Sequence, residues 1–261
     1  MYDFEFVKPS SIAEAAKALS ADGAQALSGG QTLLPTMKQR LASPGTLVSL
    51  TGIAEMKGVC KGDGGLHIGA ATPHAVVAKE AAAYYPALAA LAGGIGDPAV
   101  RNRGTIGGSI ANNDPAACYP SAVLASGATV VTNKRQIAAD DYFQGMFTTA
   151  LDEGEFVTEV RFPIPQKAAY LKFNQPASRF ALTGVFVAKF ADGVRVAVTG
   201  ASNDGVFRWR DAEKALSADF SAKAIVGLTV DASDMISDLH GTPEYRANLV
   251  KVLTGRAVQA A

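Results

Sequence analysis

Two glycine pairs, each followed by hydroxyl or amide side chains, are the residues of this sequence best suited to holding a ligand. The first lies in SGGQTLLP, residues 28–35, and the second in RNRGTIGGSIANNDPAACYP, residues 101–120. Glycine permits positive φ and close backbone approach, so successive amides can point into one hollow that favours anions. Hydroxyl groups would add donors to phosphate oxygens; they belong to Ser28, Thr32, Thr105 and Ser109. Two such loops are suited to gripping the two halves of a pyrophosphate.

Other site chemistries find little support. A single glycine pair also occurs in ordinary turns, so the two loops are informative only together. Neither loop matches GxxxxGK[ST], and the GGIG at residues 93–96 does not match GxGxxG, which disfavours a P-loop and a Rossmann site. The three histidines lack metal-ligand spacing, and no Ser-His-Asp arrangement is evident, so each histidine is expected to be structural or solvent-facing. We predict no catalytic side chain and no metal site.

The two cysteines, Cys60 and Cys118, lack CxxC spacing and are too few for an iron–sulfur cluster, which takes four ligands. Among the 261 residues, 24 basic and 24 acidic side chains cancel, which disfavours a nucleic-acid or anionic-membrane partner. The N-terminus lacks a signal-peptide pattern, and no apolar run approaches the ~20 residues of a membrane span. We expect a cytoplasmic protein of two or three lobes.

Hydrophobic spacing predicts elements on both sides of each loop. Ser11 and Glu14 form a possible capping box for a first helix. A hairpin is predicted over residues 183–202, with its turn at Asp192-Gly193, and a linker follows Pro163. The GTIGGS segment is interpreted as a loop. The remaining predictions are strands at residues 24–27, 46–50, 66–72, 128–133 and 155–163, and helices at 33–41, 86–92, 116–126 and from Pro243, with a further Ala-rich helix before Pro86.

The glycine loops resemble the two flavin-binding loops of the FAD-binding medium subunit of molybdenum hydroxylases, the group that contains carbon monoxide dehydrogenase and xanthine dehydrogenase. The resemblance runs from FEFVKPSSIAEAAKAL through GAATPHAVV and EFVTEVRFP. The stretch GVFVAKFADGVRVAVTGASNDGVFR is most similar to medium subunits of the carbon monoxide dehydrogenase type. The resemblance implies an α+β chain with the vanillyl-alcohol-oxidase (PCMH) type FAD fold. In this fold, the chain would divide into FAD-binding subdomains at residues 1–55 and 56–166 and a carboxy-terminal domain at residues 167–261. The carboxy-terminal domain would contain a three-stranded sheet and a helical bundle.

The resemblance also implies cofactor contacts. The first loop would wrap the FAD pyrophosphate and reach toward the flavin with Leu27, Ser28, Gly29, Gly30, Gln31, Thr32, Leu33 and Leu34. The second would contact pyrophosphate and adenosine with Thr105, Ile106, Gly107, Gly108 and Ser109. Ile95 would cover the isoalloxazine and Val157 would back it, with ordinary core packing as the alternative for both. Lys172 would lie near the flavin, with a solvated strand lysine as the alternative.

One position departs from the family pattern. Cys118 stands where many relatives have an aspartate that contacts the adenosine ribose. Asp114 would either take over some of that polar contact or cap the following helix. A lower FAD affinity than in relatives is the expected consequence of the change.

The function that the resemblance implies is electron transfer. A large molybdopterin subunit would oxidise the substrate, a small subunit with two [2Fe-2S] clusters would relay electrons, and this chain would pass them from FAD to an external acceptor, in a dimer of heterotrimers. One rival is a self-sufficient FAD oxidoreductase of the same fold, although no convincing base or covalent attachment residue is evident. The other is a non-redox nucleotide-binding module. The substrate and the acceptor stay open.

Overall fold

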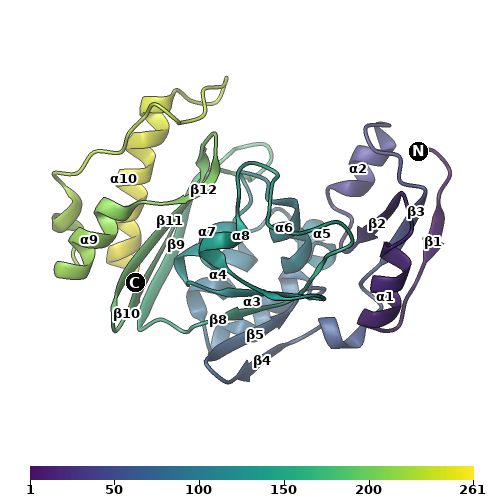
Figure 1. Cartoon of the computed structure of the whole chain (residues 1–261). Coiled ribbons are helices and arrows are strands. Elements are labelled where there is room, and N and C mark those ends of the chain that lie inside the picture. The colour runs from purple at the N-terminus through teal and green to yellow at the C-terminus, as the bar shows by residue number, and fades with distance from the viewer.

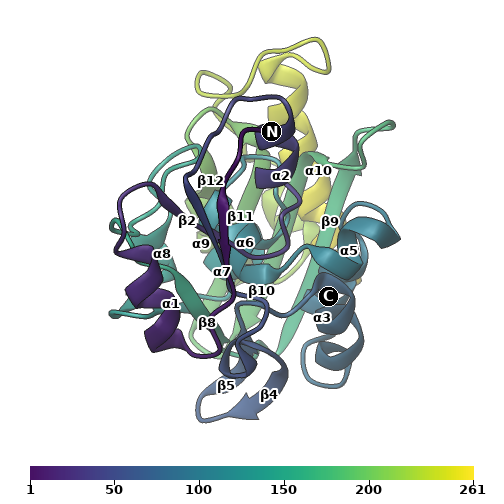
Figure 2. The same ribbon diagram turned by 90° about the vertical axis from the view of Figure 1, so that its right-hand side faces the viewer.

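Three β-sheets follow one another along the chain in the computed structural model, which describes residues 1–261 (Figure 1). The amino-terminal and carboxy-terminal lobes lie at opposite ends, with the second sheet between them. Viewed from the amino-terminal end, the first sheet lies in front of the rest of the molecule (Figure 2). The mixture of helices and sheets confirms the α+β class. The expected boundaries at 55/56 and 166/167 fall between the sheets and stay a prediction.

The first sheet is parallel, with strand order β1-β3-β2. Its strands are β1 (Glu5–Val7), β2 (Ala24–Leu27) and β3 (Thr46–Ser49), and its helices are α1 (Ile12–Leu19) and α2 (Leu33–Lys38). Helix α2 follows the first glycine loop, as expected, but it is shorter than the predicted helix over 33–41. The loop therefore connects the end of a strand to the beginning of a helix.

The capping box predicted for α1 forms only in part. Ser11 Oγ accepts a hydrogen bond from the Glu14 amide at 3.2 Å, as an N-cap should. The Glu14 carboxylate, however, accepts from the amide of Ser10 at 2.8 Å and from its hydroxyl at 2.9 Å. The return bond thus reaches one residue earlier than a capping box requires.

The second sheet has five antiparallel strands in the order β4-β5-β8-β6-β7. These are β4 (Val59–Gly62), β5 (Gly65–Gly69), β6 (Thr129–Thr132), β7 (Gln136–Ala138) and β8 (Val157–Phe162). The helices of this region are α3 (His74–Glu80), α4 (Pro86–Gly93), α5 (Pro98–Arg103), α6 (Ile106–Asn112), α7 (Tyr119–Ala125) and α8 (Ala139–Tyr142). Short 3-10 turns cover Ala54–Met56 and Ala81–Ala83. The predicted helix over 116–126 starts at Tyr119.

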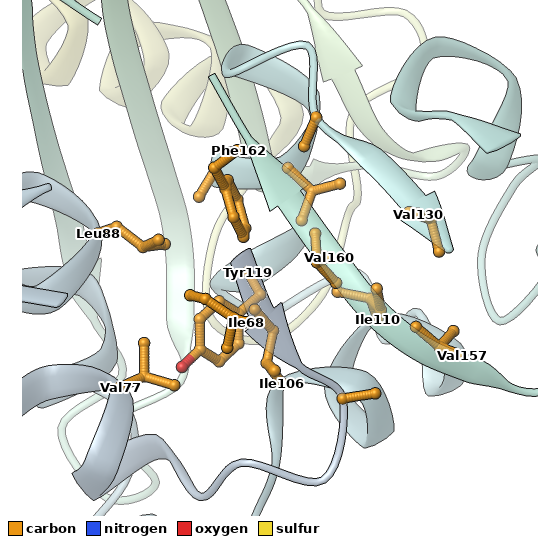
Figure 3. Packing of buried hydrophobic residues seen from close by; sticks show 14 of the residues in the cluster. Ile68, Val77, Leu88, Ile106, Ile110, Tyr119, Val130, Val157, Val160 and Phe162 are labelled. Atoms are coloured by element: carbon orange, nitrogen blue, oxygen red, sulfur yellow. The ribbon is translucent and has the colours of Figure 1, made fainter. Parts of the chain in front are cut away.

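The main core lies in this region, where helices pack on the sheet. Figure 3 shows Ile106 and Ile110 of α6 gathered with Ile68 of β5 and Val160 of β8. All four side chains are fully buried. Burying aliphatic groups of this size contributes roughly 1.5–3 kcal/mol each. The second glycine pair is therefore carried by a helix that the core holds firmly.

The GTIGGS segment is not a loop, contrary to the sequence interpretation. Thr105 is the N-cap of α6, and its hydroxyl accepts from the Gly108 amide at 3.2 Å. A Cβ on Gly107 would come within 2.5 Å of the Ala70 Cβ. Glycine is a poor helix former, but here close packing against Ala70 requires it, so tertiary contact overrides local propensity.

The third sheet is antiparallel, with order β12-β11-β10-β9. Its strands are β9 (Lys167–Asn174), β10 (Ala181–Phe190), β11 (Gly193–Ser202) and β12 (Gly205–Arg208). Helices α9 (Arg210–Ala218) and α10 (Pro243–Ala260) and a 3-10 turn at Ala222–Ile225 accompany it. The sheet has one strand more than expected, because the short β12 pairs with β11.

The β10–β11 hairpin was predicted correctly, but its turn lies one residue earlier than expected. Phe190 pairs with Gly193, which leaves Ala191 and Asp192 as the two loop residues. Gly193 is therefore the first residue of β11 rather than part of the turn.

Candidate functional site

A cavity of about 800 Å³ is lined by both glycine segments. Its other walls come from the segment between α4 and α5, from the residues that lead into β8, and from the loop between β9 and β10. Cavities of this size are typical of small-molecule and cofactor sites. The fold thus brings together the two segments that the sequence singled out.

The two glycine segments contact each other directly. Ser28 Oγ and Thr105 Oγ1 lie 2.7 Å apart and share a hydrogen bond. A Cβ on Gly29 would collide with the Arg103 carbonyl oxygen and would lie 2.6 Å from the Gly104 Cα. Gly29 is therefore required for contact between two backbones, a role that the sequence did not indicate.

The first segment carries the free donors of the site. The backbone amides of residues 28 to 33 find no acceptor within the chain. Gly30 has a φ of 69°, which favours glycine, and Thr32 caps α2 without a side-chain hydrogen bond. Consecutive amides without partners beside a cavity are suited to phosphate oxygens. An anion hollow in the first loop stays a prediction, which these free amides support.

The second segment differs from that expectation. The Ile106 amide donates to Thr72 O at 3.3 Å, the Gly107 amide to Ala70 O at 2.9 Å, and the Gly108 amide to Thr105 Oγ1. These amides are thus already satisfied within the protein, and the prediction of a second amide hollow was wrong. The residues of α6 and its N-cap that line the cavity are Thr105, Gly107, Gly108, Ser109, Ala111 and Asn112.

Most of the residues predicted for the site line this one cavity. They are Leu27, Ser28, Gly29, Gly30, Gln31, Thr32, Leu33, Ile95, Thr105, Gly107, Gly108, Ser109, Asp114, Val157 and Lys172. Leu34 and Ile106 do not line it. Leu34 packs against the small cluster of Leu27 and Met37, and Ile106 is fully buried in the main core. Leu34 and Ile106 therefore anchor the two glycine segments to hydrophobic clusters of the fold.

Apolar side chains form one part of the cavity wall. Ile95 and Val157 both line it, together with Leu50 and Met56. The Ile95 backbone is fixed because Arg101 Nη1 donates to Ile95 O at 3.0 Å. A flat aromatic group would find van der Waals contact here and little competition from water.

Asp114 caps a turn. Its Oδ1 accepts from the Ala116 amide at 2.8 Å, whereas α7 begins only at Tyr119, with Cys118 as its N-cap. Of the two alternatives for Asp114, the observed contact is local, and it caps a turn that precedes the helix. Cys118 is buried, free of any disulfide, and lines the cavity.

His74, which was expected to be structural or solvent-facing, is buried and lines the cavity. It is 4% exposed, and its Nδ1 has no hydrogen-bond partner. Burial, and then the charge of Arg101, lower the pKa of His74 to about 4, so the ring is neutral at pH 7. The sequence signals a helix start at Pro73, but the direction of the next side chain depends on tertiary packing.

Glu155, which was not predicted as a site residue, holds the segment that leads into Val157. Its side chain is fully buried and accepts from Thr132 Oγ1, from the Asp152 amide at 2.9 Å and from Arg135 Nε at 3.1 Å. Burial raises the pKa of this carboxyl, but the hydrogen bonds from Arg135 and the other donors outweigh burial and lower it to about 2. The cavity wall thus depends on an ionised carboxylate.

Replacing Glu155 by Gln should destabilise the protein in a pH-dependent way. The folded-state pKa of about 2 lies below the ordinary value of 4.5, so the carboxylate stabilises the fold above pH 4.5, and that contribution is lost as the pH falls through 2. We expect Glu155→Gln to lower the free energy of unfolding by up to about 3 kcal/mol at pH 7 and by less than half of that at pH 3. Urea unfolding at both pH values measures this, and an equal loss at both would contradict it.

No group of three or more His, Cys, Asp or Glu side chains is placed to hold a metal ion. None of the helices combines the length and the apolar character needed to cross a membrane.

Comparison with known proteins places this geometry in context. The model of the family described as the FAD binding domain in molybdopterin dehydrogenase matches residues 2–165. The carbon monoxide dehydrogenase medium chain of Afipia carboxidovorans is 32% identical, over 99% of this chain and 96% of that one. The glyceraldehyde dehydrogenase medium chain of Sulfolobus acidocaldarius is 33% identical, over 98% and 97%. A solved structure of reconstituted CO dehydrogenase from Oligotropha carboxidovorans superimposes with a TM-score of 0.90 at 31% identity, over 99% of this chain and 97% of that one.

Proposed function

Because the chain belongs to the family of FAD-binding domains in molybdopterin dehydrogenases, we propose that it binds FAD in the cavity between the glycine segments and passes electrons through it. The observation that carries this proposal is the run of acceptor-free amides at residues 28 to 33, a segment that lines the cavity and contacts the second segment through Ser28 and Thr105. A diphosphate needs several donors at close range, and this run supplies them.

The rest of the cavity fits FAD as well. Gly108 leaves room at the meeting point of the two segments, since a Cβ there would lie 3.6 Å from the Ser28 Cβ. Apolar residues of the lining, among them Leu50, Met56, Ile95 and Val157, suit an apolar ring system. The volume of about 800 Å³ lies in the range of cofactor sites.

In this proposal, the residues of the chain bind and orient the cofactor. When bound, the isoalloxazine supplies the redox chemistry, and the protein supplies binding and orientation. The amides of the first segment hold the diphosphate, Ser109 and Thr105 add hydroxyl donors, and Ile95 with Val157 exclude water from the ring. No side-chain nucleophile is required.

We further propose that the chain acts as the medium subunit of a multi-subunit molybdenum hydroxylase. A large subunit would carry molybdopterin, and a small subunit would carry two [2Fe-2S] clusters, in a dimer of heterotrimers. The free thiols Cys60 and Cys118 cannot ligate such a cluster, which takes four ligands. Electrons would enter from the small subunit and leave to an external acceptor.

In this proposal, the substrate-binding site of the complex lies on another chain. Relatives named for carbon monoxide and for glyceraldehyde match this chain about equally well over nearly its whole length. Medium subunits of complexes with such different substrates are thus about equally similar to this chain, so we infer that the medium subunit does not select the substrate. Carbon monoxide is one candidate.

Reconstitution with FAD tests the proposed function. The purified chain, alone and together with its partner subunits, should retain a yellow chromophore through gel filtration, and FAD should displace bound ADP-ribose. Binding of ADP-ribose or ATP without any flavin uptake would instead support a nucleotide-binding module. Substrate turnover by the flavin-loaded chain alone would support a self-sufficient oxidoreductase.

A further inference from the structure

The ammonium group of Lys172 joins three separate walls of the cavity. Lys172 Nζ lies 2.8 Å from Gly94 O, 2.9 Å from Arg179 O and 3.6 Å from Cys118 Sγ. These acceptors belong to the end of α4, to the β9–β10 loop and to the N-cap of α7. A lysine ammonium has three N–H donors, so each of them has a partner within the chain. None is left over for a ligand in this arrangement.

The first wall that Lys172 holds carries Ile95. Arg101 Nη1 donates to both Ile95 O and Gly96 O at 3.0 Å. Together with the Lys172 bond to Gly94 O, three consecutive carbonyl groups are thus fixed by two cations. Hydrogen bonds from charged donors are roughly twice as strong as those between neutral groups. The backbone position of Ile95 therefore depends on Lys172 as well as on Arg101.

The second wall is the β9–β10 loop, residues 175–180. Its residues 177 to 180 line the cavity but are exposed on their outer side. Arg179 has a φ of 62°, a conformation that non-glycine residues seldom adopt without support. The bond from Lys172 to Arg179 O is the contact that ties this loop across the cavity to the α4 end. Without it, the loop would keep the internal bonds between Gln175 and residues 179 and 180 and the bond from the Phe180 amide to Ser178 Oγ.

We propose that Lys172 is a positioning residue that closes the cavity by tying the Ile95 segment to the β9–β10 loop, and that it makes no direct bond to the flavin. The proposal rests on the proposed function for the identity of the ligand, but the clamp itself belongs to the chain without ligand. A lysine whose only role is a bond to the ring would leave both segments unchanged when it is removed. The two possibilities therefore differ in the protein that lacks FAD.

Hydrogen exchange of the full-length, FAD-free chain tests the clamp. In Lys172→Met, we expect the hydrogen-bonded amides of the two segments to exchange at least about tenfold faster than in the unchanged chain, while β10 and α6 keep their protection. These amides are those of Gly94, Ile95, Gln175, Arg179 and Phe180. Lys172→Arg, which keeps a cation with several donors, should restore much of the protection. Lys61→Met, which removes an exposed lysine from a strand of the second sheet, is the matched control and should change neither segment. Unchanged exchange in both segments of Lys172→Met would overturn the proposal, as would faster exchange throughout the molecule.

A second measurement uses the flavin-loaded protein. We expect FAD to dissociate about tenfold faster from Lys172→Met, because the closed wall opens, while the reduction potential of the flavin that stays bound is unchanged. A shifted potential with unchanged exchange would show direct contact with the ring and overturn the clamp. If no variant binds FAD at all, the proposed function fails, whereas the exchange experiment still decides the clamp.

Discussion

Gly29→Val is expected to abolish FAD retention and to lower the melting temperature, because the new side chain would occupy the space of the Arg103–Gly104 backbone. The two glycine segments cannot then keep the Ser28–Thr105 hydrogen bond of 2.7 Å. We expect a loss of about 1–3 kcal/mol in the free energy of unfolding, as for other overpacked sites, and a loss of FAD affinity of at least ~100-fold. Thermal unfolding and flavin fluorescence measure the two effects.

The matched control for this substitution is Gly45→Val. A Cβ on Gly45 would meet no atom within 4 Å, and its φ is not positive, so valine fits there without strain. Gly45→Val should bind FAD as the unchanged chain does. Normal flavin retention in Gly29→Val would show that the two segments can separate without consequence for the ligand.

Gly108→Val should abolish FAD retention while leaving stability nearly unchanged. A Cβ at this position meets only Thr105 Oγ1 at 3.1 Å and the Ser28 Cβ at 3.6 Å, so the added methyl groups extend toward the cavity where the segments meet. Valine is also a better helix former than glycine by a few tenths of a kcal/mol, which offsets the tight contact in α6. We expect the melting temperature to stay within about 2 °C, and FAD binding to fall at least ~100-fold.

The contrast between the two variants separates binding from folding. If Gly108→Val lowers the melting temperature as much as Gly29→Val does, α6 itself is distorted. The loss of flavin would then not report on the space in the cavity. Gly30→Val is also expected to lose flavin but is a weaker test. Gly30 has a φ of 69°, and a Cβ there would lie 2.8 Å from Leu34 Cδ1, so valine would distort the loop directly.

Local sequence signals predicted the elements around the first glycine segment well. The strand at 24–27 and the helix after the loop depend on hydrophobic spacing over a few residues, which is visible in one sequence. The function and the fold type were inferred from the resemblance of the two glycine motifs to the flavin-binding loops of a known family. The family match over residues 2–165 confirms that resemblance.

The reasons for individual glycines could not be predicted from the sequence. Gly29 is needed because Arg103 lies against it, and Gly107 because Ala70 does, and both contacts join residues that are far apart in the chain. Of the four glycines in the two pairs, only Gly30 has a positive φ and so follows the local argument. The same limit applies to His74, whose place in the cavity wall depends on how α3 packs.

The fully bonded ammonium of Lys172 illustrates a further limit. The family resemblance places a lysine near the flavin, and the lysine does line the cavity. Its partners, Gly94 O and Arg179 O, are backbone atoms from two other segments, and no side-chain pattern marks them. Whether a cation serves a ligand or the protein is decided by such bonds.

The small core beneath the first glycine segment links cofactor supply to the lifetime of the chain. Only Leu27, Met37 and Leu47 form that cluster, apart from partly buried neighbours, so the amino-terminal lobe has little apolar burial of its own on this side. A ligand held by the amides of this segment stabilises the folded state by RT ln(1 + [L]/Kd), which is about 2.7 kcal/mol at a free ligand concentration of 100 times Kd. Molecules that have taken up flavin would therefore outlast empty ones during proteolytic turnover, and the pool available for assembly would be enriched in loaded subunits.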